Sequence, residues 1–287
     1  MPANASPTVR ARTLGRELRK ARETAGWSLD QAAQALGVNK ATISRVELGR
    51  TGVRQRDVRA LLMDYGVTDE QSIEALVMLS RHGRTQGWWR KHGEVTEAYG
   101  DYLGLEQQSH EIRTFEAFYI PGLLQTSDYS RAVLAASVLA TTDERATELT
   151  RVREERQRLL FAKTSTVTLS CVMSEAAIRT PVGGSAVMHE QLGRLLELHE
   201  RPQIKIQVLP FERGAHAGMT GAFVIFSFPA IEEVDIVYTE NLPGAVFFEQ
   251  QEDARKYRRA FESLSADALS PKESIEIIAD AMRGMAN

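Results

Sequence analysis

Cysteine is almost missing from this sequence: Cys171 is the single one among 287 residues. A disulfide framework within one chain is therefore excluded, and this cysteine usage fits a reducing cytoplasm. No apolar run reaches the length of about 18 residues that a membrane-spanning helix needs. The first residues, MPANASPTVRART, lack the apolar core of a secretory signal. We expect a cytoplasmic protein that begins with a short disordered arm.

Motifs of common catalytic and metal sites are missing as well. Neighbouring histidines lie at least ten residues apart, which does not fit the spacing of metal-binding motifs such as HExxH. The sequence has no GxSxG, no Walker loop and no GxGxxG. Cys171 lies in the middle of a predicted strand, which favours a buried core residue over a nucleophile. We therefore predict that the protein is not an enzyme and needs no cofactor or metal.

Charge is unevenly distributed along the chain. The whole sequence has 35 basic and 38 acidic residues, a formal net charge of −3. Residues 1–66 hold 12 basic and 6 acidic residues, a net charge of +6, which leaves −9 for the remainder. A basic N-terminal unit on an acidic body suits a polyanion-binding head joined to a module with another role.

The basic N-terminal region has the pattern of a helical bundle. Ser28 and Asn39 are N-cap residues for two short helices, and Gly37 supplies the turn between them. The predicted helices are Leu14–Thr24, Leu29–Leu36, Lys40–Leu48, Arg54–Tyr65 and Asp69–Arg84. We expect an all-α helix-turn-helix domain over residues 10–84, with the Val38 side chain packed inward.

Residues 28–49, SLDQAAQALGVNKATISRVELG, have the layout of a helix-turn-helix. In this motif the second helix enters the DNA major groove, and its first residues reach base edges. Arg45 is expected to bond guanine O6 and N7, whereas Glu47 is expected to pair with a nearby arginine. The predicted DNA-binding residues are Asn39, Lys40, Ala41, Thr42, Ser44, Arg45, Arg50 and Arg54. Arg50 and Arg54 are expected on phosphates; a helical bundle without DNA contact is the alternative.

The stretch SLDQAAQALGVNKATISRVELGR resembles the Cro/C1-type (XRE-like) helix-turn-helix family, above all in LGV and ISRVE. The resemblance implies a regulator that binds double-stranded DNA. Leu29 departs from the pattern, because many members place there a glutamine that bonds phosphate. Such heads usually act as dimers on two half-sites about one helical turn apart, so the single head per chain implies a homodimer.

The body has a mixed pattern of helices and strands. Strands are predicted at Arg113–Ile120, Thr166–Met173, Ile204–Leu209, Gly221–Ser227, Asp235–Thr239 and Val246–Phe248. Helices are predicted at Leu103–Glu111, Ser127–Ala140, Asp143–Ala162, Ser185–His199, Glu252–Leu264 and Pro271–Met282. We expect a connector over residues 85–102. A mixed α+β domain with a small, mostly antiparallel sheet is expected over residues 103–287.

Several segments of the body resemble one further family. They are FEAFYIPGLLQTSDYSRAVL, RVREERQRLL, MSEAAIRTPVGG, RPQIKIQVLPFERGAHAGMTGAFVIFSF, VDIVYTE and ALSPKESIEII. In this order they are similar to the C-terminal domain of the actinobacterial Scr1 family of antitoxin-like transcription factors. The resemblance covers about residues 110–280. It implies a regulator that is often paired with a small partner protein encoded nearby.

Three residues of the body are candidate contacts for a partner or ligand. Gln125 follows a sharp turn in PGLLQT, His216 lies in the long glycine-rich segment PFERGAHAGMTG, and Arg156 belongs to an arginine-rich helix. Each has a structural alternative. Gln125 could belong to a strand-to-helix junction capped by Thr126 or Ser127, and His216 to a solvated loop. Arg156 could form salt bridges to neighbouring glutamates.

Together these features predict a sequence-specific DNA-binding transcription regulator, a repressor or an activator, that associates with the nucleoid. Its body is expected to bind a small partner protein or an effector and so to modulate DNA affinity. One alternative is an enzyme that acts on a small molecule through its body and carries a DNA-binding head. Another is an interaction adaptor whose head has lost DNA contact.

Overall fold

The computed structural model describes residues 8–80, 88–93, 95–137, 142–162, 165–228, 234–242 and 244–285. The chain divides into two compact units, a head unit and a body unit. The head unit comprises Met1–Arg90, Glu97–Ser109 and Ser227–Asp235, and the body unit comprises Lys91–Thr96, His110–Phe226 and Ile236–Asn287. The predicted domain limits at residues 84 and 103 stay a prediction.

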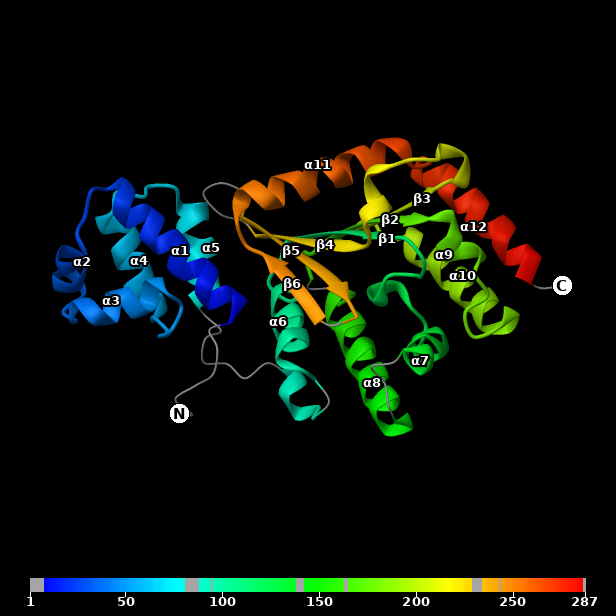
Figure 1. Cartoon of the computed structure of the whole chain (residues 1–287), viewed down its shortest axis with the longest axis horizontal. Helices are drawn as coiled ribbons and strands as arrows, with labels where there is room; N and C mark the ends of the chain where they lie inside the picture. The colour runs from blue at the N-terminus through cyan, green and yellow to red at the C-terminus, as the bar shows by residue number, and fades with distance from the viewer. Residues whose placement is uncertain are drawn as a thin grey trace. The chain divides into compact units, whose positions relative to one another are not determined.

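The head unit is built from short helices (Figure 1). They are α1 (Val9–Thr24), α2 (Leu29–Leu36), α3 (Lys40–Glu47), α4 (Gln55–Asp64), α5 (Glu70–Ser80), the 3-10 helix η1 (Trp88–Lys91) and α6 (Glu97–Glu106). The bounds of α2 and α3 agree with the predicted ones to within one residue. Arg84, the predicted end of the last helix of the bundle, lies outside the described residues.

The first helix begins earlier than the sequence pattern indicates. The Thr8 hydroxyl accepts a hydrogen bond from the Ala11 backbone N–H, and the Val9 side chain is only 1% exposed. The Val9 N–H donates to Asp101 Oδ2 at 3.3 Å. The expectation of a disordered arm is therefore wrong from Val9 onward. Asp101 lies in α6, which begins inside the predicted connector, and no local signal near Val9 indicates this distant contact.

The core of the helix-turn-helix forms where α2 crosses α3 and α4. Small residues of α2, Ala32 and Ala33, pack against Ile43, Leu61 and Tyr65. The Cβ-only side chains allow the helices to approach closely. Val38, which the sequence placed in this core, is 39% exposed. That expectation is wrong, because the turn uses the Val38 N–H, which bonds to the Ala33 carbonyl, while the side chain stays outside.

The body unit alternates strands and helices. Its strands are β1 (Glu111–Glu116), β2 (Thr168–Ser174), β3 (Ile204–Leu209), β4 (Phe223–Phe228), β5 (Val234–Asn241) and β6 (Gly244–Phe248). The last two residues of β4 and the first two of β5 are grouped with the head unit. Its helices are α7 (Ser127–Ala136), α8 (Asp143–Leu160), α9 (Glu175–Arg179), α10 (Ser185–His199), α11 (Gln251–Asp267) and α12 (Pro271–Met285), with 3-10 turns η2 (Gly122–Leu124), η3 (Phe211–Arg213) and η4 (Ala217–Thr220). Residues 138–140, part of one predicted helix, lie outside the described residues.

The strands form one mixed sheet in the order β3-β2-β1-β4-β5-β6. This confirms the α+β class. Strands β1, β2 and β3 pair in parallel, whereas β5 and β6 pair antiparallel. The expected mostly antiparallel pairing is thus wrong for the β1-β2-β3 half. The reason is topological: α7 and α8 follow β1, and α9 and α10 follow β2, so each connection is a crossover that returns the chain in the same direction.

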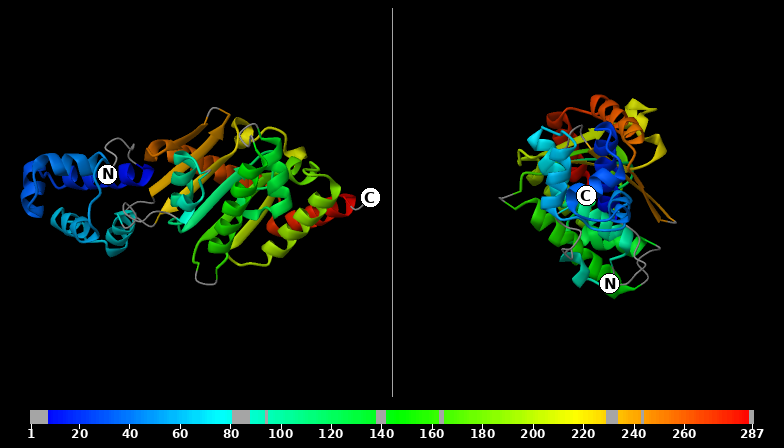
Figure 2. Two further views of the ribbon diagram at one scale, coloured as in Figure 1. Left: turned by 90° about the horizontal axis from the view of Figure 1, so that it is seen from below. Right: turned by 90° about the vertical axis from the view of Figure 1, so that its left-hand side faces the viewer.

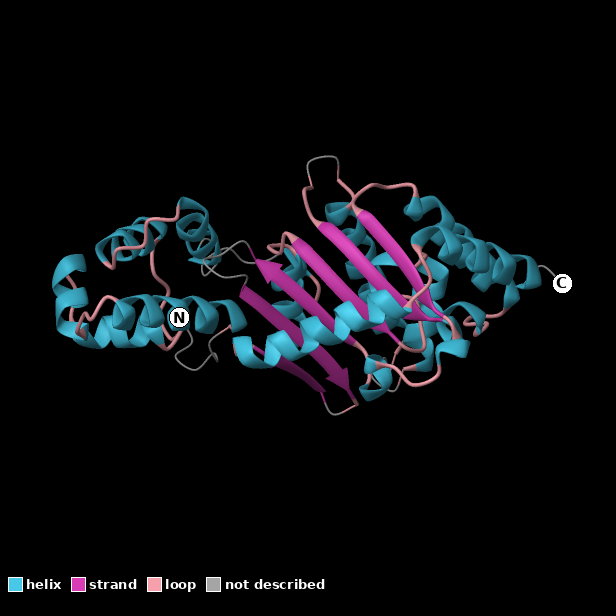
Figure 3. Cartoon of the chain, turned by 90° about the horizontal axis from the view of Figure 1, so that it is seen from above, coloured by secondary structure: helices cyan, strands magenta, loops and turns pink. Residues whose placement is uncertain are grey.

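Helices cover both faces of the sheet. Helix α11 crosses one face (Figure 3), and α8 and α10 lie on the other (Figure 2). On the α11 side, Phe115, Val172 and Val237 of the strands pack against Phe261 and Leu264 of the helix. Because both faces are covered, most strand residues are apolar without strict alternation.

Candidate DNA-binding site

Two side-chain caps define the helix-turn-helix. The Ser28 hydroxyl accepts from the Gln31 N–H, and the Gln31 side chain accepts from the Ser28 N–H at 2.8 Å, which is a complete capping box. Gly37 ends α2 with φ of 65°, a left-handed conformation that favours glycine. Asn39 Oδ1 then accepts from the Thr42 N–H at 2.8 Å and starts α3. The end of α2 and the start of α3 are therefore fixed by local hydrogen bonds.

The C-terminal end of α3 is held against α1. At Gly15 the two backbones are so close that a Cβ would lie 2.5 Å from the Glu47 carbonyl oxygen. Glu47 also pairs with Arg22 at 2.6 Å, as the sequence predicted for a nearby arginine. Both contacts keep the buried face of α3, Ile43 and Val46, in the bundle and leave the opposite face outside.

The outward face of α3 carries the residues predicted to reach base edges. Lys40, Ala41 and Arg45 are exposed, and Thr42 and Ser44 are half-buried. Three polar side chains on this face, Asn39, Thr42 and Arg45, form a chain of hydrogen bonds. Thr42 Oγ1 donates to Asn39 Oδ1 at 2.9 Å, and Arg45 Nη2 donates to Thr42 Oγ1 at 3.1 Å. The i, i+3, i+6 spacing of these residues was visible in the sequence, but the chain of bonds was not inferred from it.

Lys40 has an acidic neighbour that sequence reasoning missed. Its Nζ lies 2.8 Å from Asp30 Oδ2, and both side chains are more than half exposed. Such an exposed pair is worth about 0–1 kcal/mol. A DNA phosphate can replace Asp30 at little cost, so the pair is compatible with a phosphate contact.

Arg50 and Arg54 flank the loop after α3, and both are exposed. The Arg50 N–H bonds to the Arg45 carbonyl at 2.8 Å, which closes the end of α3. Arg54 is the N-cap of α4 and makes no side-chain capping bond, so this helix begins one residue later than predicted. The two side chains are therefore available at the same end of the motif. Leu29, the departure from the family pattern, packs against the head core.

The body candidates differ in accessibility. Gln125 is 2% exposed and Arg156 is 6% exposed, whereas His216 is half-buried. Gln125 Nε2 donates to the Ile120 carbonyl at 2.7 Å, and His216 Nδ1 accepts from the Gly218 N–H at 3.1 Å. Burial does not favour a surface contact at Gln125 or Arg156. Their predicted role in binding stays a prediction.

The PGLLQT segment is a tightly bonded strand-to-helix junction. Thr126 caps α7, as the structural alternative predicted. Gln157 Nε2 bonds the Gly122 and Gln125 carbonyls, and Arg153 Nη1 bonds Gln125 Oε1 at 2.8 Å. Arginines of α8 were expected in solvated salt bridges. This holds for Arg158, which pairs with Glu155, but Arg153 and Arg156 are directed into the interior.

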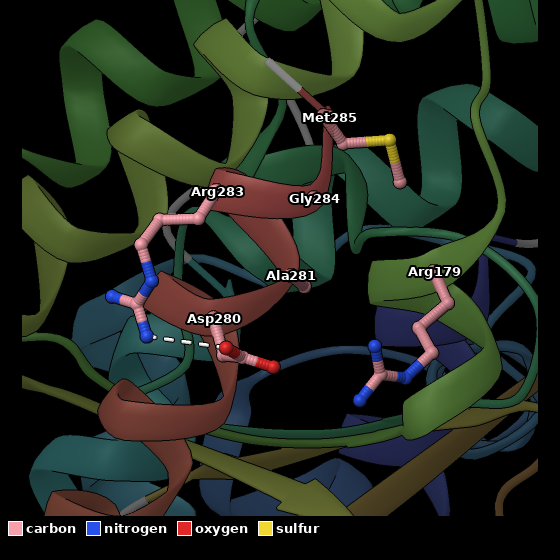
Figure 4. A pocket seen from close by; sticks show the side chains of 6 residues that line it. All are labelled: Arg179, Asp280, Ala281, Arg283, Gly284 and Met285. Carbon is pink, nitrogen blue, oxygen red and sulfur yellow. Dashed lines mark hydrogen bonds and ion pairs between the residues drawn. The ribbon is translucent and has the colours of Figure 1, made fainter. Parts of the chain in front are cut away.

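The body contains one buried thiol and one pocket, and neither has the arrangement of a catalytic site. Burial raises the pKa of the Cys171 thiol well above its ordinary value, so the thiol stays protonated. A pocket of about 420 Å³ lies between α9 and the end of α12 (Figure 4). Its charged residues are already paired, Asp280 with Arg283 and Arg179 with Glu175. Within the described ranges no group of three or more metal-ligating side chains gathers, and no helix is long and apolar enough to span a membrane.

Comparison with protein families assigns both regions. A helix-turn-helix domain model matches residues 13–76, which contain the α2-turn-α3 geometry described above. A model for a domain of unknown function, DUF5753, matches residues 99–280, more than half of the chain. The chain belongs to the DUF5753 family. No curated protein and no solved structure matches it. This DUF5753 protein thus carries a DNA-binding type of head, which supports a role in transcription regulation.

Proposed function

We propose that this protein is an XRE-like, sequence-specific transcription regulator that reads one half-site with α3. The observation that carries the proposal is the outward face of α3, where Asn39, Thr42 and Arg45 are linked by hydrogen bonds. A guanidinium held by such a chain loses less side-chain freedom on binding than a free one. Bidentate bonding of Arg45 to guanine would supply about 1–3 kcal/mol of discrimination against another base.

Phosphate contacts would position the head on the duplex. Lys40, Arg50 and Arg54 lie around the α3 face and are exposed. Two such heads, on two half-sites about one helical turn apart, are needed for high specificity, so the active form is proposed to be a homodimer. Binding to nucleoid DNA in the cytoplasm and repression, including of its own promoter, are parts of the same proposal.

The body is proposed to control when the head binds. Its acidic balance, a net −9 outside residues 1–66, does not suit DNA, and it suits a separate binding role. The similarity to Scr1-type regulators supports a small partner protein as the occupant. We propose that the body acts by binding and not by catalysis, which the neutral Cys171 thiol favours.

Genome-wide DNA capture with the full-length protein tests the first part. The proposal expects a few sites with paired half-sites, its own promoter among them, and steeply salt-dependent binding. Uniform recovery of DNA without a shared motif would show that the head is not a specific reader. Co-purification from native cells tests the second part: recovery of the protein with itself alone would remove the partner from the proposal.

A further inference from the structure

Among the residues that the structure describes, the sheet of the body ends in a strand whose outer edge pairs with no other strand. β6 is the last strand in the order β3-β2-β1-β4-β5-β6, and its other edge pairs antiparallel with β5. Its sequence is Gly-Ala-Val-Phe-Phe. It contains no charged residue and no proline, the devices that usually protect a sheet edge against pairing. Within the strand, Val246 is 43% exposed.

The opposite edge of the same sheet is protected. On β3 the Val208 N–H donates to the Ser274 hydroxyl at 2.9 Å, and the Val208 carbonyl accepts from the Leu269 N–H at 2.9 Å. Helix α12 packs along this strand, and Lys205 places a charge on it. The contrast between the two edges singles out β6 as the one suited to accept a further strand.

We propose that β6 pairs antiparallel with β6 of a second copy of this chain, which joins two six-stranded sheets into one. The inference rests on the proposed function in one respect: a single DNA-reading head per chain requires a dimer. A two-fold axis through Val246 places this residue opposite its own copy, Ala245 opposite Phe247, and Gly244 opposite Phe248. An antiparallel strand pair has this two-fold symmetry by nature, so it gives a closed, isologous dimer.

The side chains suit self-pairing. Phe248 packs on Tyr257 of α11, with ring centroids 5.3 Å apart, so Val246, two residues away, shares the α11 face of the sheet. Phe247 contacts Tyr238, with ring centroids 5.2 Å apart, on the other face. Pairing of two β6 strands therefore brings apolar residues together on both faces. Glu249 lies beyond the paired segment, so no like charges meet across the axis.

The strand pair alone is small compared with a stable interface of about 800 Å² per partner. The dimer is therefore expected to be weak, with a dissociation constant in the micromolar range, and DNA with two half-sites would strengthen it by holding both heads. The two-fold axis runs perpendicular to the sheet and does not exchange its two faces. Both copies of α11 therefore lie on the same face of the joined sheet.

Charged substitutions of Val246, the residue on the axis, test the interface in the full-length protein. Val246→Lys and Val246→Glu each place two like charges against each other only in the proposed dimer. Sedimentation velocity over a concentration series should show about a tenfold or larger rise in the dissociation constant for each variant. A one-to-one mixture of the two variants should recover association, because opposite charges then meet across the axis. Met219→Lys, which changes a 73% exposed apolar residue elsewhere, should self-associate like the wild type.

Recovery in the mixture also shows that both variants are folded. A wild-type protein that stays monomeric at all concentrations, or variants that dimerise unchanged, would overturn the β6 interface. Loss of association that the mixture does not restore would overturn it as well. DNA capture separates a failure of the interface from a failure of the proposed function. If the Val246 variants still dimerise and bind specific DNA sites, only the β6 interface is rejected. If the protein binds no specific DNA sites, only the proposed function is rejected.

Discussion

Arg22 and Glu47, 25 positions apart in the sequence, meet in a two-pronged ion pair. Arg22 Nε donates to Glu47 Oε1 at 2.6 Å, and Arg22 Nη2 donates to Oε2 at 3.0 Å. Both side chains are more than nine-tenths buried. Arg22 Nη1 also donates to the Trp27 carbonyl at 2.8 Å. One guanidinium therefore joins α1, the entry to α2 and the end of α3, and its hydrogen bond with Glu47 raises the Arg22 pKa above its ordinary value.

Loss of this pair should loosen the recognition helix. Glu47→Ala leaves the Arg22 charge buried without its carboxylate, which typically costs about 3–5 kcal/mol. Hydrogen–deuterium exchange of α1 and α3 should speed up accordingly. Arg19→Ala removes one partner of the exposed Arg19–Glu23 pair in α1, leaves both carboxylates beside Arg22 in place, and serves as the control, with a loss below about 1 kcal/mol. Equal effects of the two substitutions would contradict the role of the buried pair.

The close approach of α1 and α3 at Gly15 should tolerate no side chain. Gly15→Ala would place Cβ 2.5 Å from the Glu47 carbonyl oxygen, so the helices must separate, at a cost of about 1–3 kcal/mol. Gly52→Ala, in the loop after α3, meets nothing within 4 Å and is the matched control. Thermal unfolding of the wild type and of the two variants measures the difference in stability. A Gly15→Ala variant as stable as Gly52→Ala would show that the backbones are not in contact.

Glu116 should make the stability of the body depend on pH. The Glu116 side chain is 7% exposed. Burial, and then the nearby Glu240 charge, raise the Glu116 pKa from an ordinary value of 4.5 to about 8. Between these pH values the folded protein keeps a proton that the unfolded chain has released. The free energy of unfolding therefore falls as pH rises through this window, by at most about 1.4 kcal/mol per pH unit.

Glu116→Gln should remove this slope and gain stability over the wild type as pH rises from 5 to 8. Denaturant unfolding at several pH values measures it. Glu240→Gln, which removes the second carboxylate, should lower the Glu116 pKa. The pH range over which the free energy of unfolding falls should then end at a lower pH. If wild type and Glu116→Gln show the same pH slope, Glu116 does not hold a proton near neutral pH.

Arg50 is expected to contact phosphate and so to lack base preference. Arg50→Ala should weaken binding to all sequences about equally and reduce the slope of log K against log salt by about 1. Titrations of specific and random duplexes at several salt concentrations measure both quantities. A loss confined to one base position would instead make Arg50 a base reader.

Local signals explain why the head could be predicted closely. The Ser28 and Asn39 caps and the Gly37 turn act within three or four residues, so they were readable in the sequence, and α2 and α3 have their expected bounds to within one residue. Local signals do not predict the exposure of Val38, because that exposure depends on where the neighbouring helices leave space. Nor do they predict the burial of Val9, since this depends on Asp101, 92 residues away.

Nonlocal contacts explain what the sequence did not reveal in the body. Strand positions follow from short patterns, but parallel pairing of β1 with β2 depends on crossover helices between them. The arginines of α8 look alike in the sequence, yet Arg158 is solvated and Arg153 bonds Gln125 in the interior. Which of them is buried is decided by the packing of α8 against the junction after β1.

Base discrimination by Arg45 can be measured on the captured operator. Wild type, Arg45→Ala and the surface control Arg19→Ala are titrated against the operator and all its single-base variants. Arg45→Ala should lose about 1–3 kcal/mol at one guanine position, so that the four bases there bind alike, while discrimination elsewhere and the behaviour of Arg19→Ala stay unchanged. Undiminished discrimination by Arg45→Ala at every position would contradict sequence reading by the outward face of α3.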